Sequence, residues 1–329
     1  MTMNQAVDDQ HVDLEMLATE SRNPATVHID AVSTIELCRM INNEDLKVAK
    51  AVSLHIDTIA RVIDQITSRL ARGGRVIQLG AGTSGRLGVL DASEIPPTYS
   101  APVESYIGLI AGGDQALRKS VEDAEDSRQQ GQEALATLDP PLSKQDTVIG
   151  IAASGRTPYV LGALEHANST GCLTVGIACV ENSAFRQEGN CEEVVECIVG
   201  PEVVTGSTRM KAGTATKLLL NMISTGVMIR TGKTYGNLMV DLKTANHKLV
   251  VRARRVFRAI VATASEEYEI KRDALADDEA VDAILRNSDG SVKVAALAYL
   301  RDCSAETARA LLQASEGRLK QALASPTVR

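Results

Sequence analysis

The chain has 329 residues, of which 44% are hydrophobic and only 2% aromatic, and its formal net charge is −7. Such an acidic chain, with no tryptophan and two phenylalanines, has neither the broad basic surface of a nucleic-acid-binding protein nor the aromatic platforms that stack single-stranded bases. An anionic ligand would therefore need a local site made of backbone N–H groups and a few cations.

The cysteines and the hydropathy pattern indicate in which cellular compartment the protein lies. The six cysteines are scattered without a C-x-x-C pair, in a chain large enough to fold without disulfides. We expect them to be reduced, small and buried. No apolar run approaches the roughly 20 residues that span a membrane, and the polar N-terminus is unlike a signal peptide. These features predict a cytoplasmic protein that binds neither nucleic acid nor a membrane.

The first 74 residues predict an arm followed by helices. Residues 1–30 read as an extended arm, and Ser33 with Glu36 forms the capping box of a short helix ending near Ile41. From 44 to about 72, apolar residues alternate spacings of three and four, which predicts a long helix with one apolar stripe. The stripe comprises Ala49, Val52, Ile56, Ile59, Ile63, Ile66 and Leu70. Gly73 and Gly74 end this helix.

After residue 74 the pattern changes to short apolar runs that are typical of buried strands. These runs predict five strands, at 75–79, 105–110, 147–152, 173–178 and 193–199. Helices are expected near 87–93, 115–122, 127–135, 158–169 and 208–230. Strands that alternate with helices form a parallel, doubly wound α/β sheet, with ligand sites at the carboxyl ends of the strands.

The C-terminal part has a different composition. A helix is predicted from 237 to 264, and three or four short Ala/Leu-rich helices follow within 270–323, one of them capped by Ser304. We therefore expect an N-terminal arm and short helix at 1–43, a catalytic α/β domain at 44–265, and a small helical subdomain at 266–329.

Three loops rich in small residues accompany the predicted strands and helices. They are GAGTSGR at 80–86, AASGRTP at 152–158 and GSTRMK at 206–211. At the start of a helix such a loop presents free N–H groups and the positive end of the helix dipole to an anion, and Ser and Thr hydroxyls can donate further bonds. In the second loop, Thr157 is placed as an N-cap and Pro158 as the first helical residue. One such loop is as often an ordinary turn, but the combination favours a phosphate site.

The first loop also raises a nucleotide alternative, because Gly80, Gly82 and Gly85 match G-x-G-x-x-G. A dinucleotide-binding domain needs an acidic residue about 20 residues further on, at the end of the next strand. Here the first acid beyond the second predicted strand is Asp114, more than 30 residues after Gly80. We therefore expect no nucleotide cofactor.

Two glutamates follow these loops and are candidates for acid–base chemistry. Glu94 lies in LDASEIPPTY, and Glu125 lies in SVEDAED. A single glutamate is more often a solvated surface charge, but both could lie at the carboxyl edge of the sheet. Two carboxylates in different environments can divide the roles of acid and base, although spacing alone does not establish that here.

Six segments together resemble a known family, that of N-acetylmuramic acid 6-phosphate etherase, which has the sugar-isomerase (SIS) fold. The resemblance runs in order from about Glu15 to Arg258 and is loose beyond it. The segments are TESRNPAT (19–26), GAGTSGRLGVLDASE-PPT (80–98), IAGG (110–113), GIAASGRTPYV (150–160), GPEVVTGSTRMKAGTATK (200–217) and GNLMVD (236–241). Two departures occur: Ile95 stands where the family usually has Cys, and Val180 where it often has Asn.

The resemblance implies roles for particular residues. Glu94 matches the proton donor of the family and Glu125 its second active-site glutamate. The positions that match substrate or phosphate binding are Thr83, Ser84, Ser154, Gly155, Arg156, Thr157 and Ser207. The implied substrate is N-acetylmuramic acid 6-phosphate, and neither a metal nor another cofactor is implied.

The implied reaction cleaves the lactyl ether at carbon 3 and gives N-acetylglucosamine 6-phosphate and D-lactate by elimination followed by addition of water. Two other functions stay open: a non-catalytic sugar-phosphate sensor, since relatives of the fold include a regulator of glucokinase, and an aldose–ketose isomerase. SIS proteins commonly pair through helices beside the site. The long stripe at 44–72 and the apolar helix at 208–230 likewise favour a homodimer with pockets completed by the partner.

Overall fold

Five parallel strands form the central sheet of the computed structural model, which describes residues 19–241, 247–264 and 277–325. Their order is β2-β1-β3-β4-β5, which confirms the predicted doubly wound sheet. Each strand begins within one residue of its predicted start. The strands β1, β3 and β4 are buried throughout, and such strands are continuous apolar runs. The bounds are β1 Val76–Gly80, β2 Tyr106–Ile110, β3 Thr147–Ile151, β4 Leu173–Ala178 and β5 Glu193–Glu196.

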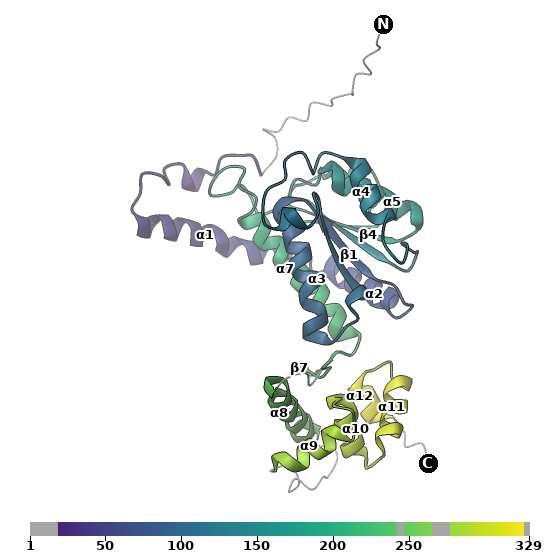
Figure 1. Cartoon of the computed structure of the whole chain (residues 1–329). Coiled ribbons are helices and arrows are strands. Elements are labelled where there is room, and N and C mark those ends of the chain that lie inside the picture. The colour runs from purple at the N-terminus through teal and green to yellow at the C-terminus, as the bar shows by residue number, and fades with distance from the viewer. Residues whose placement is uncertain (1–18, 242–246, 265–276, 326–329) are drawn as a thin grey trace.

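Helices cover both faces of this sheet (Figure 1). One face packs against α1 (Thr34–Ser53), α2 (Ile56–Leu70), α3 (Gly82–Tyr99) and α7 (Lys211–Arg230). The other face packs against α4 (Arg128–Ala136), α5 (Pro158–Thr170) and the short α6 (Ala184–Gln187). Helix α7 is buried along most of its length, as its apolar sequence predicts.

The first N-terminal helix begins where it was predicted, but the break between the first and second helices lies further along the chain. The capping box of Ser33 and Glu36 is present, yet α1 continues to Ser53, and the break lies at Leu54–His55 rather than near residue 42. Helix α1 continues because Glu44, just past the expected break, is buried against α7. The described part of the expected arm is also not extended, since it forms turns and a 3₁₀ turn at Pro24–Thr26; residues 1–18 lie outside the described residues.

Helix α3 is longer than predicted, starting at Gly82 inside the first loop and continuing through Pro96 and Pro97. The first turn of α3 packs closely against the end of β1. A Cβ atom added at Gly85 would lie 2.5 Å from the carbonyl oxygen of Gly80, and a Cβ atom added at Gly80 would lie 2.7 Å from the backbone nitrogen of Gly85. These contacts require glycine at both positions. Close helix–strand packing thus accounts for the first and third glycines of G-x-G-x-x-G, whereas the middle one, Gly82, has open space around it and a φ of +51°.

A hairpin connects the sheet to the C-terminal helices. Strands β6 (Thr234–Tyr235) and β7 (Leu238–Met239) turn at Gly236, whose φ is +54°. The expected helix from 237 is therefore wrong at its start; α8 spans His247–Ala264, and residues 242–246 lie outside the described ones. The expected helix at 115–122 is also wrong, since this region has only a 3₁₀ turn at Asp114–Leu117; another such turn is at Val103–Ser105.

The C-terminal helices share a hydrophobic cluster of their own with the hairpin and lie below the sheet in Figure 1. They are α9 (Asp278–Arg286), α10 (Val292–Arg301), α11 (Ala305–Ala314) and α12 (Leu319–Ala324). Ser304 caps α11 as predicted, with its Oγ accepting from the N–H of Thr307 at 3.1 Å. The domain boundaries at 43 and 265 stay predictions, and 265–276 lie outside the described residues.

The thiols are free, and Cys172, Cys179 and Cys197 are buried as expected, whereas Cys38 is exposed on α1. Burial raises the pKa of Cys172 to about 11. Within the described ranges, the helices are too short or too polar to cross a membrane.

Candidate active site

A cavity of about 270 Å³ opens where the connections after β1 and β3 diverge. This is the switch point of a doubly wound sheet, where ligands commonly bind. We call it the loop cavity. Its walls come from the N-terminal segment, from both loops after these strands, from the region after β2, and from the start of α7.

The first loop contributes the start of α3. Ala81 is in the N-cap position, and no side chain among the described residues caps this helix. The first N–H groups of a helix lack intrahelical partners, and the Thr83 and Ser84 side chains stand beside them at the cavity. Backbone and hydroxyl donors are therefore presented together to an anion.

The second loop contributes Ser154 and Thr157. Thr157 is the N-cap residue of α5 and Pro158 its first residue, as predicted, but Thr157 makes no capping bond in the part of the chain described. Its hydroxyl is therefore free to donate to a ligand. Gly155 has φ +62°, and a Cβ there would lie 2.4 Å from the Cβ of Ser183, so the turn requires glycine.

The third loop differs from the other two. The N–H groups of Lys211 and Ala212, at the start of α7, donate to Glu202 Oε2 and Oε1 at 3.0 and 2.9 Å. The carboxylate of Glu202 thus takes the place of an external anion, and the expectation that this loop offers free N–H groups is wrong at these two positions. The loop instead forms a wall of the cavity with Thr208, followed by the first turns of α7.

A buried ion pair fixes α7 against α1. Lys211 Nζ lies 2.6 Å from Glu44 Oε2, and both side chains are at most 4% exposed. Burial raises the pKa of Glu44, but hydrogen bonds from Lys211 and Lys47 outweigh this effect and lower it to about 2. Glu44 is therefore ionised at neutral pH, and the pair holds the start of α7 in place beside the cavity.

A second ion pair fixes α7 against α3. Lys217 Nζ lies 2.7 Å from Asp91 Oδ1, and Gln78 Nε2 of β1 donates to Asp91 Oδ2 at 3.0 Å. Three elements around the cavity, β1, α3 and α7, are thus joined by polar contacts beneath it.

The structure brings together five of the predicted site residues. Thr83, Ser84, Ser154, Thr157 and Glu125 all line the loop cavity.

The other four, Gly155, Arg156, Ser207 and Glu94, are outside its lining. Glu94 is exposed on α3, ten residues beyond Ser84, which corresponds to about 15 Å along the helix axis. Glu125 and the first two loops therefore share a cavity, while Glu94 of the same chain lies well away from it.

The pattern of strands and helices in the sequence does not predict that the N-terminal segment reaches this cavity. Thr19 and Glu20 reach the cavity from the N-terminal segment, which no strand or helix pattern connects to the sheet. The signal that could have found them is the match of TESRNPAT to the family.

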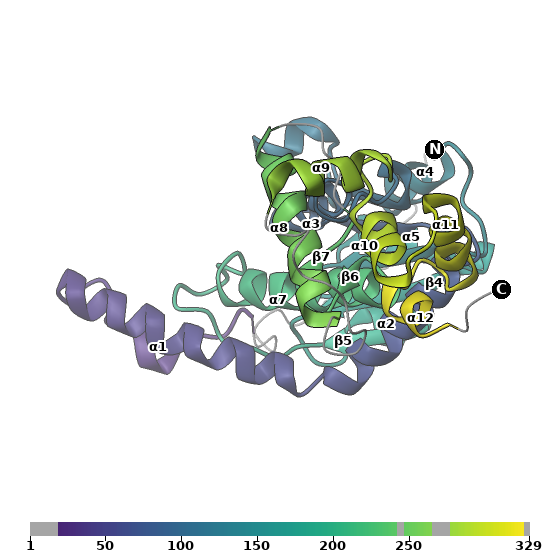
Figure 2. The same ribbon diagram turned by 90° about the horizontal axis from the view of Figure 1, so that it is seen from below.

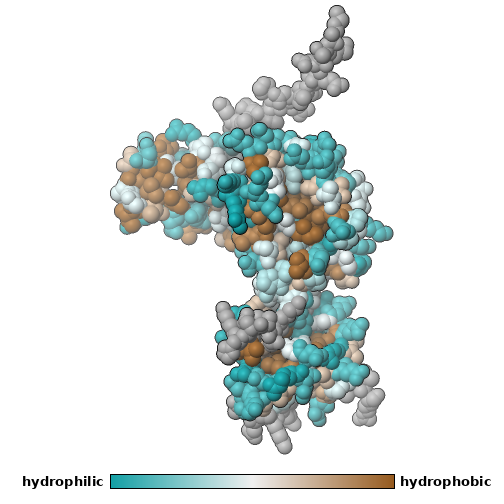
Figure 3. All heavy atoms as spheres, viewed as in Figure 1, coloured by the Kyte–Doolittle hydropathy of each residue, from teal (hydrophilic) through white to brown (hydrophobic). Residues whose placement is uncertain are grey.

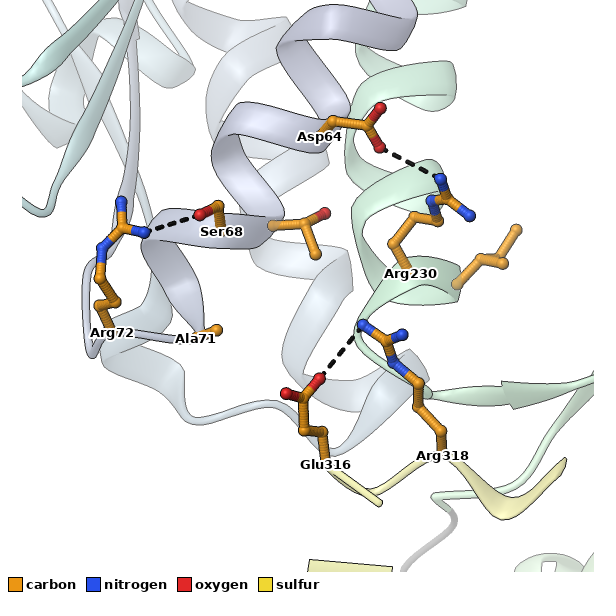
Figure 4. A pocket seen from close by; sticks show the side chains of 9 residues that line it. Asp64, Ser68, Ala71, Arg72, Arg230, Glu316 and Arg318 are labelled. Atoms are coloured by element: carbon orange, nitrogen blue, oxygen red, sulfur yellow. Dashed lines mark hydrogen bonds and ion pairs between the residues drawn. The ribbon is translucent and has the colours of Figure 1, made fainter. Parts of the chain in front are cut away.

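A larger cavity, of about 600 Å³, lies between α2, the end of α7 and the residues before α12 (Figure 4). Its arginines already have partners: Arg230 pairs with Asp64 at 3.3 Å and Arg318 with Glu316 at 3.4 Å. Arg72 donates to Ser68 Oγ at 2.7 Å. Its charges are largely compensated, and its lining includes residues that precede β1 rather than residues at the carboxyl ends of the strands. The loop cavity is therefore the better candidate for the chemistry.

Comparisons with known proteins identify the family of the chain. Residues 58–168 match the model of the glucokinase regulatory protein N-terminal SIS domain. The N-acetylmuramic acid 6-phosphate etherase of Lactobacillus acidophilus is 54% identical over 256 residues, 78% of this chain and 85% of that protein. A solved phosphoheptose isomerase from Francisella tularensis is 16% identical, covers 60% of this chain and 98% of its own, and has a TM-score of 0.44.

The etherase of Pasteurella multocida (strain Pm70) is 48% identical over 310 residues, which cover 94% of this chain and 97% of that protein. Since this identity extends over nearly the full length of both, the chain belongs to the N-acetylmuramic acid 6-phosphate etherase family.

Proposed function

We propose that this protein cleaves the D-lactyl ether of N-acetylmuramic acid 6-phosphate to give N-acetylglucosamine 6-phosphate and D-lactate. One observation carries the proposal: a chain of this family places hydroxyls, free helix N–H groups and Glu125 around one cavity at the switch point of the sheet. The cavity offers donors for a phosphate and a carboxylate for proton transfer. We also propose that the protein acts in the cytoplasm.

The chemistry follows from the substrate. When the sugar ring opens, the aldehyde at carbon 1 acidifies the proton on carbon 2. A base removes this proton, the bond from carbon 3 to the lactyl oxygen breaks, and an acid protonates the departing lactate. Water then adds across the carbon 2–carbon 3 double bond, with OH at carbon 3 and H at carbon 2. The steps need a positioned acid, a base and donors for the enolate oxygen.

We assign Ser84, Ser154 and Thr157 to the phosphate, together with the first N–H groups of α3. Glu94 is proposed as the acid and Glu125 as the second carboxylate. The family match keeps Thr83, Gly155, Arg156 and Ser207 in the proposed substrate-binding set.

An assay of D-lactate release from N-acetylmuramic acid 6-phosphate tests the function. The proposal expects lactate and N-acetylglucosamine 6-phosphate in equal amounts. A sensor would bind the sugar phosphate and release no lactate, whereas an isomerase would convert an aldose phosphate to a ketose phosphate. Either of these outcomes would contradict the proposal.

Replacing Ser154 with alanine is expected to raise the Michaelis constant about 10–100-fold, because a hydrogen bond to a charged phosphate contributes about 1.5–3 kcal/mol. Steady-state kinetics of lactate release measure the effect. Ser169→Ala is the matched control, since Ser169 is exposed at the far end of α5 and its Oγ donates to the carbonyl oxygen of His166 at 2.7 Å. An unchanged constant for Ser154→Ala would place the phosphate elsewhere.

We further propose that the active form is a homodimer in which the partner subunit supplies Glu94. Carbon 3 is only three carbon atoms from the phosphate-bearing carbon 6, whereas Glu94 lies about 15 Å along α3 from Ser84 of its own chain. The loop cavity is also slightly smaller than the usual range of about 300–1,000 Å³ for ligand sites. Both features suggest a pocket that a second chain completes.

The surface favours the same arrangement. Helix α1 projects from the rest of the molecule (Figure 2), and hydrophobic residues gather over this region in Figure 3. Ile35, Leu46 and Leu54 are 59%, 70% and 79% exposed. Large exposed apolar side chains along one projecting helix are typical of a protein interface.

Mixing two impaired variants tests the shared pocket, when lactate release is assayed at a substrate concentration well below the wild-type Michaelis constant. Light scattering should give about twice 35.0 kDa. A dimer of one Glu94→Gln subunit and one Ser154→Ala subunit has one intact pocket. The Glu94→Gln subunit supplies the loops of this pocket, and the Ser154→Ala subunit supplies its Glu94. An equal mixture, in which half of the dimers are mixed, should recover about one quarter of wild-type activity. A fully active monomer would contradict the dimer, and a dimer without recovery would contradict only the sharing.

A further inference from the structure

The segment from Thr19 to Thr26 is bonded to the chain before α7, and its first two residues line the loop cavity. Asn23 Nδ2 donates to the carbonyl of Pro201 at 3.1 Å, and Thr26 Oγ1 donates to the carbonyl of Val203 at 2.9 Å. Glu202, between these two acceptors, is the residue that caps α7. The segment and the third loop are therefore fixed to each other, and the start of the segment has a defined position at the cavity.

Thr19 lies at the wall of the cavity and has a buried hydroxyl that lacks a partner among the described residues. The residue is 2% exposed and lines the loop cavity, and its Oγ1 has no hydrogen-bond partner among the described residues. Buried hydroxyls are nearly always bonded, since leaving one unpaired costs free energy. A hydroxyl left unpaired at the wall of a ligand cavity is explained if the ligand supplies the partner.

Glu20 places a second carboxylate in the same cavity, beside the third loop. Its Oε2 would lie 3.1 Å from a Cβ at Gly206, whose φ is +75°. The absence of a side chain at Gly206 thus provides the space that the Glu20 carboxylate occupies. A carboxylate accepts hydrogen bonds from sugar hydroxyls and amide N–H groups, whereas it repels a phosphate. Its place is therefore beside the sugar, and the serine and threonine loops remain for the phosphate.

We propose that Thr19 and Glu20 are substrate-binding residues that recognise the sugar rather than the phosphate. The Thr19 hydroxyl bonds a polar atom of the sugar, and Glu20 accepts from a sugar hydroxyl or from the acetamido N–H. The assignment rests on the proposed sugar-phosphate function. It makes these residues, carried by a segment outside the sheet, determinants of sugar specificity.

Binding of N-acetylglucosamine 6-phosphate and of inorganic phosphate to the full-length protein, measured by calorimetry, tests this proposal. Thr19→Val is expected to weaken sugar-phosphate binding about 3–10-fold, which corresponds to one neutral hydrogen bond. Glu20→Gln is expected to weaken it about 10-fold. Phosphate alone should bind Thr19→Val unchanged, and should bind Glu20→Gln as well as or better than the wild type, because a repelling charge has been removed.

Thermal unfolding provides a second and independent readout. Since the Thr19 hydroxyl is unpaired in the free protein, Thr19→Val should unfold at the wild-type temperature or above it. Thr19→Ser, which keeps the hydroxyl, should restore the affinity. Glu306→Gln, at an exposed position of α11, is the matched control for Glu20→Gln and should leave both affinities unchanged.

The outcomes separate this inference from the proposed function. Wild-type affinity for the sugar phosphate in both variants, or parallel losses for sugar phosphate and phosphate, would overturn the assignment. If the wild type releases no lactate but binds N-acetylglucosamine 6-phosphate through Thr19 and Glu20, the etherase function is contradicted and the sugar-binding role of the two residues is supported. A wild type that binds neither ligand would overturn both.

Discussion

Replacing Glu94 with glutamine is expected to slow lactate release about 10²–10⁴-fold while the affinity for N-acetylglucosamine 6-phosphate stays near the wild-type value. The amide keeps the size of the side chain but cannot donate a proton to the departing lactate, and general acid catalysis contributes a factor of this size. Glu94 is exposed on α3, so the free energy of unfolding should not change.

Turnover number and product affinity, measured on the same preparation, check this result. Glu104→Gln is the control, because Glu104 is also an exposed glutamate, in the 3₁₀ turn before β2. A turnover number of Glu94→Gln close to that of the wild type would remove Glu94 from the mechanism. A loss of affinity equal to the loss of rate would instead make it a binding residue.

Replacing Lys211 with methionine is expected to lower the free energy of unfolding by about 3–5 kcal/mol, because Glu44 then keeps a buried charge without its buried partner. Lys47 also pairs with Glu44, but its side chain is 60% exposed, so it compensates the charge only from the solvent side. Denaturant unfolding measures the change. The double variant Glu44→Gln, Lys211→Met removes both charges and should recover most of the loss.

The same pair predicts how stability depends on pH. The pKa of Glu44 is lowered to about 2 in the folded protein from 4.5, so its contribution is complete above pH 4.5 and is lost as the pH falls towards 2. The contribution is on the order of 3 kcal/mol. Stability measured against pH should fall less steeply below pH 4.5 in Glu44→Gln than in the wild type. If stability fell equally steeply with pH in Glu44→Gln and the wild type, or if Lys211→Met kept the wild-type free energy of unfolding, the Glu44–Lys211 pair would not contribute to stability.

The sequence predicted the sheet well because its signal is local. The run Leu173–Ala178 matches β4 at both ends, since a buried strand needs only apolar residues between turns. Helix ends were predicted less well where distant residues decide them. Helix α1 continues past residue 42 because Glu44 meets Lys211, 167 positions further along the chain, and no local pattern reports such a contact.

Those residues of the candidate site that directly follow strands could be predicted from the sequence, whereas those placed by distant contacts could not. Ser84, Ser154 and Thr157 follow strands, and the rule that strand ends gather at one edge brought them together. The capping of α7 by Glu202 was missed, because a glutamate nine residues before a helix has no standard spacing as a cap. Thr19 was missed for a related reason, as its position depends on contacts between the N-terminal segment and residues 201–203.

The late position of α7 in the chain has a consequence for biosynthesis. Val48, Val52 and Ile59 of α1 and α2 belong to the hydrophobic cluster that α7 completes with Leu219, Ile223 and Val227. A ribosome releases the first two helices well before the segment that covers them. Their apolar faces are therefore covered only in part, by the sheet, in nascent chains shorter than about Arg230, and such chains expose surface on which incomplete proteins aggregate. The N-terminal helices thus depend on synthesis running at least to the end of α7.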